Sequence, residues 1–565
     1  MKSAVALALL AGSAAASNSS CRCFPGDSCW PSTSSWDSLN STVGGRLVKT
    51  LPLGAVCHDP HYDEAACQDL RDNWTAPQIH EPSSSSVMSP YFANQSCDPF
   101  TDRARPCELG NYVRYAVNVT SASDVSAALA FAKKKNLRVV VRNTGHDFLG
   151  RSTGAGSLGI WMHHLKNITK LEWSDSSFTG TAFKMGAGVL GYEATAATGA
   201  EGRLVITGEC PTVGVAGGYT QGGGHGALSS QFGLAADQVL EWEVVTADGV
   251  LRRANRQENS DLFWALSGGG GGTFGVVMSV TVRSYEDAPI AGLGLQMSAA
   301  YTTQDNWYKI IAAFNQLVPQ MTAKKAMVVY YFNNAVMVIN PVTLYNGTVA
   351  QIEDMMAPWF NMLANMSVPY SKTAVVSPSN YAHYNTWMGP LPYGHVEVSA
   401  YQFGSRLLDT DTIAHNNDNL TAALRYITSN GGLAVGSAVH AQPPAGVALS
   451  DNAVLPAWRT SGVHMQITTA WNNTPSAWDT MLENQAVMTD DFVPRLNAVT
   501  PKSGTYMNEA DFRQPTWKKD FFGDNYNRLL KIKQKYDPSN VFWSLKTVGS
   551  DAWSVDEQTG RMCRA

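Results

Sequence analysis

The sequence carries little charge and has no long apolar stretch beyond its first residues. Asp, Glu, Lys and Arg make up 15% of the 565 residues, below the roughly 25% of an average domain. With 41 basic and 46 acidic residues the net charge is −5, and no basic run exceeds Lys133 to Lys135. The clustered positive charge that nucleic-acid binding requires is therefore absent. After the N-terminus no stretch of about 18 uninterrupted apolar residues occurs, so no membrane-spanning helix is predicted.

Two common catalytic motifs are missing as well. The sequence contains neither the Walker GK[ST] signature nor the zincin HExxH motif. A P-loop nucleotidase and a zinc protease are thus disfavoured. No metal site is predicted, because Cys21, Cys23 and Cys29 lack the paired CxxC spacing of zinc sites.

The N-terminus is typical of a secretory signal peptide. Lys2 precedes an apolar run over residues 4–11, and small residues continue to Ala16, a stretch too short to span a bilayer. We predict cleavage near Ala16 or Ser17 and a soluble, secreted, extracellular protein of a eukaryotic cell. A surface carrying N-glycans is also predicted. The sequons are at Asn18, Asn40, Asn73, Asn94, Asn118, Asn167, Asn346, Asn365, Asn419 and Asn472.

The number of cysteines is odd. Nine cysteines in an oxidising compartment leave at least one without a disulfide partner. Seven lie before residue 110, and Cys563 lies near the C-terminus. If Cys210 has another role, the other eight can all pair, and Cys563 must then reach back to the N-terminal region. Alternatively, Cys210 is a buried free thiol that only packs.

Two glycine-rich segments carry the strongest functional signal. The first, RNTGHD (Arg142 to Asp147), follows a β-branched run at residues 139–141 that is typical of a buried strand. Gly145 allows a tight turn close to a ligand, and successive amides in such a turn can bind a pyrophosphate. The second segment covers residues 208–249 and contains Cys210 before another glycine-dense turn. This second turn could cover a flat ring system.

Both segments resemble the flavin-binding core of the vanillyl-alcohol oxidase superfamily. They are most similar to its berberine-bridge-enzyme-like, oxygen-dependent FAD-linked oxidoreductases, here of a secreted fungal type. In that family the histidine of a RxxGHD-like loop and the cysteine of a GxCPTVG motif both bond to FAD. The resemblance, which extends from about residue 111 to about 542, implies covalent FAD on His146 and Cys210. Further cofactor-binding residues implied are Arg142, Asn143, Thr144, Gly145, Asp147, Gly208, Val213, Gly214, Gly218, Gly223, Val277 and Asn508.

The implied fold is α+β, with a two-part FAD-binding domain and an antiparallel-sheet substrate domain flanked by helices. One face of that sheet is expected to roof the flavin. Its strands are predicted at residues 326–332, 336–344, 395–403, 433–440 and 461–471. The expected divisions are a signal peptide (1–17), a Cys-rich extension (18–110), the FAD-binding domain (111–286), the substrate domain (287–500), a C-terminal segment returning to the FAD domain (501–547) and a tail (548–565).

The catalytic base is where the chain departs from the family pattern. In plant members a catalytic tyrosine follows the asparagine of a YxNY motif near the C-terminus. Here the motif begins at Tyr506 and has Glu509 in the place of that tyrosine. Tyr506 and Glu509 are therefore candidate catalytic residues. Glu509 could equally be an exposed acid that a helix dipole favours.

Two further catalytic candidates come from other segments. His464 matches in position a catalytic glutamate of the family, and it shares one face of its strand with Gln466 and Thr468. A histidine titrates near neutrality and can act as a base, but His464 could instead be a hydrogen-bonded structural residue. Tyr219 stands near a family histidine that stabilises the reduced flavin, although VGVAGG contains one extra residue.

The predicted function is that of an FAD-dependent oxidase with an alcohol substrate, such as a sugar, a simple or aromatic alcohol, or a secondary metabolite. Hydride would pass to the flavin, and molecular oxygen would be reduced to hydrogen peroxide. An alternative is an oxidative cyclase or dehydrogenase of a biosynthetic pathway. An alternative of another class is a flavin-loaded binding protein without turnover, which the altered base positions motivate.

Overall fold

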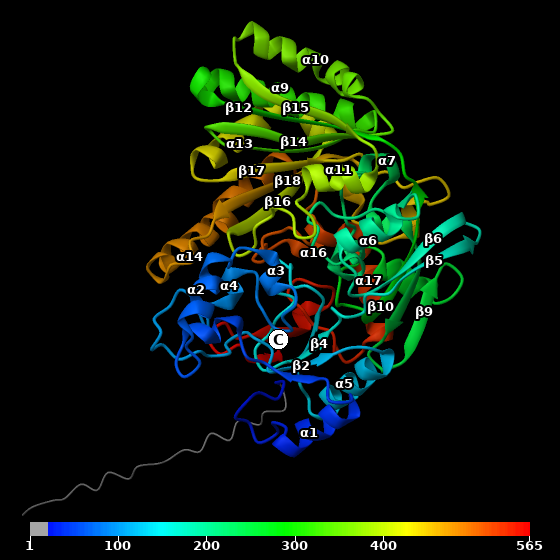
Figure 1. Ribbon diagram of the computed structural model, residues 1–565, viewed down its shortest axis with the longest axis vertical. Coiled ribbons are helices and arrows are strands. Elements are labelled where there is room, and N and C mark those ends of the chain that lie inside the picture. The colour runs from blue at the N-terminus through cyan, green and yellow to red at the C-terminus, as the bar shows by residue number, and fades with distance from the viewer. Residues whose placement is uncertain (1–20) are drawn as a thin grey trace, which may run out of the picture.

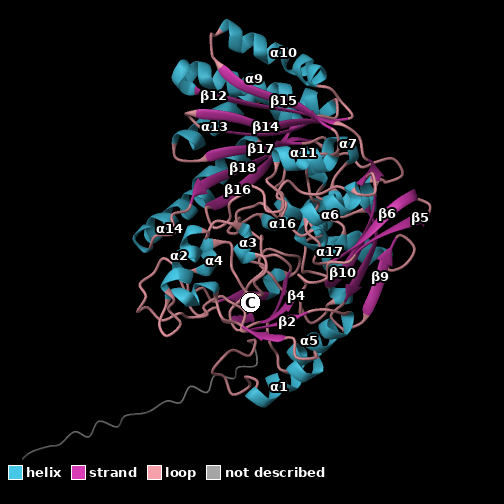
Figure 2. Ribbon diagram, viewed as in Figure 1, coloured by secondary structure: helices cyan, strands magenta, loops and turns pink. Residues whose placement is uncertain are grey.

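A seven-stranded sheet occupies the upper half of the molecule, above a lower half built on smaller sheets (Figures 1 and 2). This computed structural model describes residues 21–565. The predicted signal peptide and Asn18 lie outside the described residues. Within residues 21–565, no helix combines the length and the apolar character needed to cross a membrane.

A βαβ unit carries the first glycine-rich turn. β2 (Tyr115–Asn118) and β3 (Val139–Arg142) both pair in parallel with β4 (Leu158–Trp161), and α5 (Ala122–Lys134) connects β2 to β3. The β-branched residues of β3 are largely buried, which the apolar run predicted. RNTGHD therefore begins on the last residue of a buried strand, which fixes the direction in which the turn leaves the sheet.

A five-stranded antiparallel sheet completes the lower half. Its strand order is β5-β6-β10-β8-β9. The strands are β5 (Ile168–Ser174), β6 (Thr179–Gly186), β8 (Val239–Val245), β9 (Leu251–Asn255) and β10 (Val276–Arg283). Helices α6 (Gly191–Gly199), α7 (Ser229–Phe232) and α8 (Ser260–Leu266) and the small pair β7 (Arg203–Leu204) and β11 (Tyr285–Glu286) belong to the same stretch of chain.

All pairings within the seven-stranded sheet are antiparallel, in the order β15-β12-β14-β13-β17-β18-β16. The strands are β12 (Ile290–Ser298), β13 (Met327–Phe332), β14 (Val336–Tyr345), β15 (Tyr370–Ser377), β16 (Tyr401–Asp409), β17 (Leu433–Ala438) and β18 (Ser461–Ala470). Helices α9 (Gln304–Ala323), α10 (Val349–Asn365) and α13 (Asn417–Ser429) share a hydrophobic core with this sheet. The α+β class and the antiparallel substrate sheet are thus confirmed.

Side-chain alternation gives this sheet two different faces. Val463, Met465 and Ile467 of β18 pack into the core shared with the helices. Gln466 and Thr468, on the opposite face, line a cavity. Burial of the apolar face against the helices therefore turns the polar residues of the same strand toward the cavity.

One strand prediction was wrong in its position. Residues 395–400 form no strand, and β16 begins at Tyr401. The alternating sequence HVEV does not pair with the sheet, because Val398 donates its N–H to Thr75 O (2.9 Å) and Ser399 donates to Met88 O (3.1 Å). Carbonyl groups of the N-terminal extension therefore accept the N–H groups that would otherwise pair with a neighbouring strand. β12 and β15 were not predicted from the sequence.

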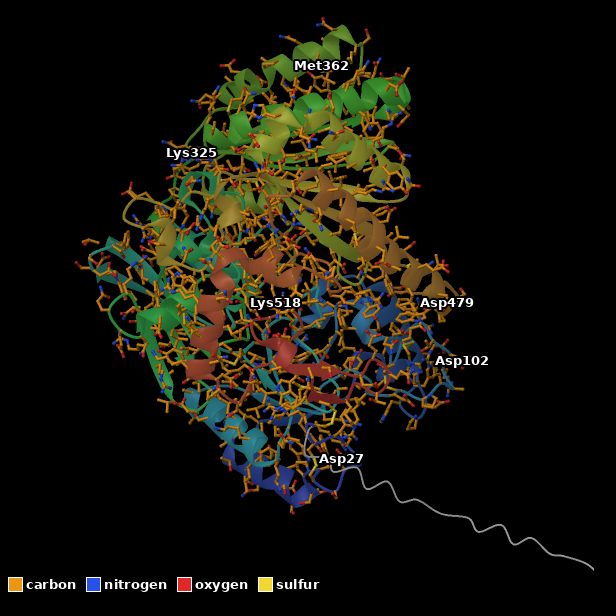
Figure 3. The ribbon with its side chains drawn as sticks, turned by 180° about the vertical axis from the view of Figure 1, so that it is seen from behind. Asp27, Asp102, Lys325, Met362, Asp479 and Lys518 are labelled. Atoms are coloured by element: carbon orange, nitrogen blue, oxygen red, sulfur yellow. A yellow bond between two sulfur atoms is a disulfide. The ribbon has the colours of Figure 1, made fainter. Side chains whose placement is uncertain are left out.

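The N-terminal extension and the C-terminal tail are joined. Cys21 forms a disulfide with Cys563, so the expectation that the tail reaches back is confirmed. Arg561 also pairs with Asp27 at 2.8 Å, and Asp27 is labelled at the base of the molecule in Figure 3. The remaining disulfides are Cys23–Cys29, Cys57–Cys67 and Cys97–Cys107. The extension contains α1 (Thr33–Thr42), β1 (Leu47–Lys49), α2 (Glu64–Asp72), α3 (Pro77–His80) and α4 (Pro90–Ala93).

The segment after the large sheet returns to the lower half. In α17 (Tyr526–Tyr536), Lys533 donates to the carbonyl of Thr273 (2.7 Å) at the glycine run 268–272. Phe542 forms an isolated parallel bridge with Val139 of β3. This segment also contains α16 (Trp517–Phe522), and the tail forms β19 (Trp553–Val555) and β20 (Met562–Arg564). The remaining helices precede it in the chain: α11 (Asn380–Trp387), α12 (Thr410–His415), α14 (Trp478–Val487) and α15 (Val493–Val499).

Candidate active site

A cavity of about 730 Å³ lies where the large sheet, the glycine-rich segments and the C-terminal segment meet. This volume is near the upper part of the range typical of ligand sites. Its walls combine glycine backbone from Gly214, Gly217 and Gly271 with side chains of the large sheet such as Tyr331 and Val435. Flat backbone on one side and side chains on the other are suited to a planar ligand with a substrate above it.

Most of the predicted cofactor-binding residues line this cavity. The exceptions are Arg142 and Gly223. Gly223 adopts φ +127° within the glycine-dense turn, so it shapes the loop. The lining residues among those predicted are Asn143, Thr144, Gly145, His146, Asp147, Gly208, Cys210, Val213, Gly214, Gly218, Val277 and Asn508.

Arg142 lies behind the turn, with 2% of its surface exposed. Its guanidinium donates to the carbonyls of Ser83 (3.1 Å), Ser86 (2.5 Å) and His80 (3.2 Å) in the extension, and to Thr144 O (3.0 Å) within the turn. Gly145 has φ +96°, and a Cβ there would meet the guanidinium at 2.5 Å. Arg142 therefore joins the N-terminal extension to the turn that presents His146.

His146 and Cys210 approach the same side chain. His146 Nε2 lies 2.7 Å from Thr212 Oγ1, and Cys210 Sγ lies 3.5 Å from the same oxygen. Burial lowers the pKa of His146 to about 3, with help from His80 and Arg142, so its imidazole is neutral. Burial also raises the pKa of Cys210. Cys210 is the one cysteine of residues 21–565 that forms no disulfide.

The cavity wall offers polar atoms suited to a polar cofactor. Asn143 Oδ1, Tyr219 Oη and Gln221 Oε1 are buried, belong to cavity-lining residues and have no hydrogen-bond partner among residues 21–565. Buried polar atoms normally have a partner. Together with the glycine amides of the two turns, these atoms fit the heteroatoms of FAD, which His146 and Cys210 would hold at one end.

The C-terminal segment is fastened to the first turn. Asp147 accepts from Arg151 Nε (2.6 Å), and Arg151 also donates to Met507 O (3.2 Å). Asn508 donates to Gly218 O (2.7 Å) of the second turn and to the hydroxyl of Tyr506 (2.8 Å). Residues from three distant parts of the chain are thereby brought together at the cavity.

Glu509 is the centre of a cluster at one end of the cavity. Its Oε2 lies 2.8 Å from His464 Nε2, 3.2 Å from His225 Nε2 and 2.7 Å from Gln466 Nε2. Glu509, His225 and Gln466 line the cavity, whereas His464 is fully buried behind them. The structure thus brings two separately predicted catalytic candidates, His464 and Glu509, into contact.

His225 stands between two carboxylates. Its Nδ1 lies 3.4 Å from Glu209 Oε1, and its Nε2 faces Glu509. Burial opposes a charge on His225, but Glu509 and Glu209 outweigh burial and raise its pKa to about 10. Burial likewise opposes ionisation of Glu509, but the two histidines hold its pKa below the usual range. At His464, burial lowers the pKa more than the neighbouring Glu509 raises it, so the pKa of His464 is lowered.

Aromatic rings surround this cluster. The Trp458 ring centroid lies 5.9 Å from that of His225 and 5.6 Å from that of His464, and the Tyr506 ring lies 5.5 Å from both. Burial raises the pKa of Tyr506, so its hydroxyl stays neutral. Burial also raises the pKa of Tyr219, the remaining predicted catalytic residue, which lines the cavity elsewhere. The cluster therefore lies in an apolar surrounding that strengthens its electrostatic interactions.

Sequence reasoning missed His225 and Glu209. Both stand inside motifs that were recognised, GGGHGA and GECPTVG. A histidine among glycines and an acid beside Cys210 were the available signals. The contact of His225 with Glu209 joins these two motifs, and its contact with Glu509, which is 284 positions away in the sequence, adds the C-terminal segment to the cluster.

Comparison with known proteins identifies the family. Residues 113–255 match the family described as FAD binding domain, and residues 505–548 match that described as berberine and berberine like. FAD-linked oxidoreductase ZEB1 of Gibberella zeae is 48% identical over 545 residues, which cover 96% of this chain and 95% of that protein. VAO-type flavoprotein oxidase VAO615 of Thermothelomyces thermophilus is 40% identical over 570 residues, covering 97% and 96%. The chain belongs to the VAO-type FAD-linked oxidoreductases.

The fold agrees with this assignment. The crystal structure of the VAO-type flavoprotein MtVAO615 from Myceliophthora thermophila C1 superposes with a TM-score of 0.92 at 40% identity, covering 97% of this chain and 100% of that one. The protein is therefore an FAD-dependent oxidoreductase. The berberine-like match over residues 505–548 includes Asn508, which contacts the second glycine-rich turn.

Proposed function

We propose that this VAO-type oxidoreductase is a secreted, N-glycosylated oxidase that holds FAD covalently through His146 and Cys210 and oxidises an alcohol, with oxygen as the acceptor. The observation that carries the proposal is the meeting of His146 and Cys210 at Thr212 on the cavity wall. A neutral imidazole can act as a nucleophile, and Cys210 is kept out of the four disulfides. Two residues that lie 64 positions apart in the sequence are thus placed to bond to the same cofactor.

Bound FAD would supply the hydride acceptor, and the chain supplies position and electrostatics. The substrate enters beneath the large sheet, where Val329, Tyr331 and Val435 form an apolar wall. The substrate hydroxyl is placed against Glu509, which is the one of the two candidate residues that lines the cavity. His464 contacts the Glu509 carboxylate from behind. The cluster around Glu509 then accepts the proton of the substrate hydroxyl.

Absorbance spectra before and after acid precipitation test the attachment. We expect the yellow colour to stay in the pellet of the wild type and of the single variants Cys210→Ala and His146→Ala, because one bond suffices to hold the cofactor. The double variant should release its flavin into the supernatant. His395→Ala, which changes another cavity-lining histidine, is the matched control and should behave as the wild type. Flavin released from the wild type would refute covalent attachment.

Oxygen use requires a separate assay. With any substrate that bleaches the flavin, an oxidase consumes oxygen and releases hydrogen peroxide in equal amounts. Turnover only with an artificial acceptor would favour the dehydrogenase or oxidative cyclase. Absence of bleaching across a broad alcohol panel would favour a binding protein.

A further inference from the structure

The cluster at the end of the cavity has the composition of a metal site. His225, His464 and Glu509 each offer one ligand atom, and these atoms all lie within 4.8 Å of one another. Two imidazoles with one carboxylate are a common ligand set for divalent first-row metals. His225 and Glu509 reach the cavity wall, so a cation held here would keep an open position toward the cavity.

Hydrogen bonding alone accounts poorly for the contacts of Glu509. Three nitrogen atoms converge on its Oε2, at 2.7 Å from Gln466, 2.8 Å from His464 and 3.2 Å from His225. A carboxylate oxygen has about two lone-pair sites, so three donors exceed its capacity. No hydrogen bond to the other oxygen, Oε1, is seen among residues 21–565. A cation ligated by both imidazoles and Oε2 would replace the two histidine donors at this oxygen, with the three ligand atoms moving slightly apart, and would remove the excess of donors.

The charge of the cluster also favours a cation. Glu209 and Glu509 place two carboxylates on either side of His225. Among the described residues, neither carboxylate forms an ion pair with a lysine or arginine. Two carboxylates without a lysine or arginine partner attract a divalent cation placed between them.

The surroundings resemble those of known metal sites. A ligating histidine normally donates its second ring nitrogen to a carboxylate, and a ligating carboxylate is itself hydrogen-bonded. Glu209 lies 3.4 Å from His225 Nδ1, and Gln466 donates to Glu509. Trp458 and Tyr506 pack around the cluster and exclude water from its far side. Of these contacts, the hydrogen bond from Gln466 would fix Glu509 in position. His225 Nδ1 faces Glu209 at ion-pair distance, and His464 Nδ1 has no hydrogen-bond partner among residues 21–565.

We propose that His225, His464 and Glu509 bind one divalent first-row cation, with zinc as the first candidate, and that its open position receives the hydroxyl oxygen of the substrate. Zinc suits the ligand set and does not exchange electrons with a flavin. A Lewis acid at this point polarises the hydroxyl of the substrate. The catalytic meaning of the site rests on the proposed alcohol oxidation, whereas the binding of the cation does not.

The experiment measures metal content in flavin-loaded, untagged protein after dialysis into metal-free buffer. Elemental analysis should find close to one divalent metal per chain, and zinc alone, titrated in competition with a chromophoric chelator, should refill chelator-stripped protein. Glu509→Gln should remove stoichiometric binding, because it replaces an anionic ligand. Glu209→Gln should weaken zinc binding about 10–100-fold, as loss of an outer carboxylate does. Glu397→Gln, another cavity-lining carboxylate outside the cluster, should bind zinc as the wild type does.

Two outcomes would overturn the proposal. In the first, the purified protein contains no stoichiometric metal, and the wild type and both cluster variants bind zinc equally weakly. The cluster would then be a hydrogen-bonded network without a cation. The other is equal loss of zinc in Glu397→Gln and in the cluster variants. Flavin absorbance and its retention after acid are recorded on the same samples. A protein with acid-stable flavin but no metal contradicts only the metal site, whereas one with metal but free flavin contradicts only the covalent attachment.

Discussion

Replacing Arg142 separates two roles that this residue could have. The sequence predicted a contact with FAD, but the guanidinium lies behind the turn and donates to four carbonyl groups. Three of these belong to the extension and one to Thr144 of the turn itself. Arg142→Met keeps much of the side-chain volume and removes every donor. It should therefore loosen the extension and displace His146, although Arg142 does not line the cavity.

The size of the effect follows from burial. Arg142 is 2% exposed, so water cannot replace the lost donors. A hydrogen bond to a charged group is worth about 1.5–3 kcal/mol, but four around one guanidinium do not add fully. A buried carbonyl left without a donor costs about 1–3 kcal/mol, and because the four carbonyls do not add fully we expect a loss of about 2–4 kcal/mol in the free energy of unfolding. Arg103→Met is the control: its ion pair with Asp59 is more than half exposed, so its loss should change the free energy of unfolding much less than the loss of Arg142 does.

Three measurements on the same preparations test this expectation. Urea unfolding gives the change in free energy, limited proteolysis reports whether the extension has loosened, and in-gel flavin fluorescence gives the covalently loaded fraction. Arg142→Met should unfold at lower urea, be cut first within residues 21–110 and carry less covalent flavin. If its loss in stability is no larger than that of Arg103→Met while flavin loading falls, the anchoring argument is refuted and a direct role in cofactor binding is favoured.

Two further predictions concern buried charges. Lys533→Met should lower the free energy of unfolding by about 3–5 kcal/mol, because Asp537, 2.6 Å away and fully buried, loses its cation. In urea unfolding, adding Asp537→Asn to this variant should restore part of the loss. No restoration would contradict the pairing. Burial lowers the pKa of His80 from 6.5 to about 4, so the stability that neutral His80 contributes is complete above pH 6.5 and lost as the pH falls to 4. His80→Gln should flatten that loss by roughly 3 kcal/mol; an unchanged pH dependence of urea unfolding between pH 7 and 4 would contradict it.

Several features of the fold could be predicted because their causes are local. The β-branched run at residues 139–141 predicted β3, and alternation along β18 predicted that Gln466 and Thr468 share a face. The residues at 395–400 show where local reasoning fails. Their alternation is real, but the carbonyls of Thr75 and Met88 accept their N–H groups, and no local pattern reveals that competition.

The candidate site divides in the same way. The resemblance of local motifs to the family singled out His146, Cys210, His464 and Glu509, because each motif consists of residues that are neighbours in the sequence. They could not show that Arg142 supports the turn from behind.

The amino-acid sequence by itself therefore determined the flavin-binding motifs, the odd number of cysteines and the alternating strands. Only the tertiary structure decided that Cys563 pairs with Cys21 and that His225 meets Glu509 from 284 positions away. The physical reason is that strand and turn preferences act between neighbours in sequence. Contacts across hundreds of residues instead depend on how the sheets and the returning C-terminal segment pack together.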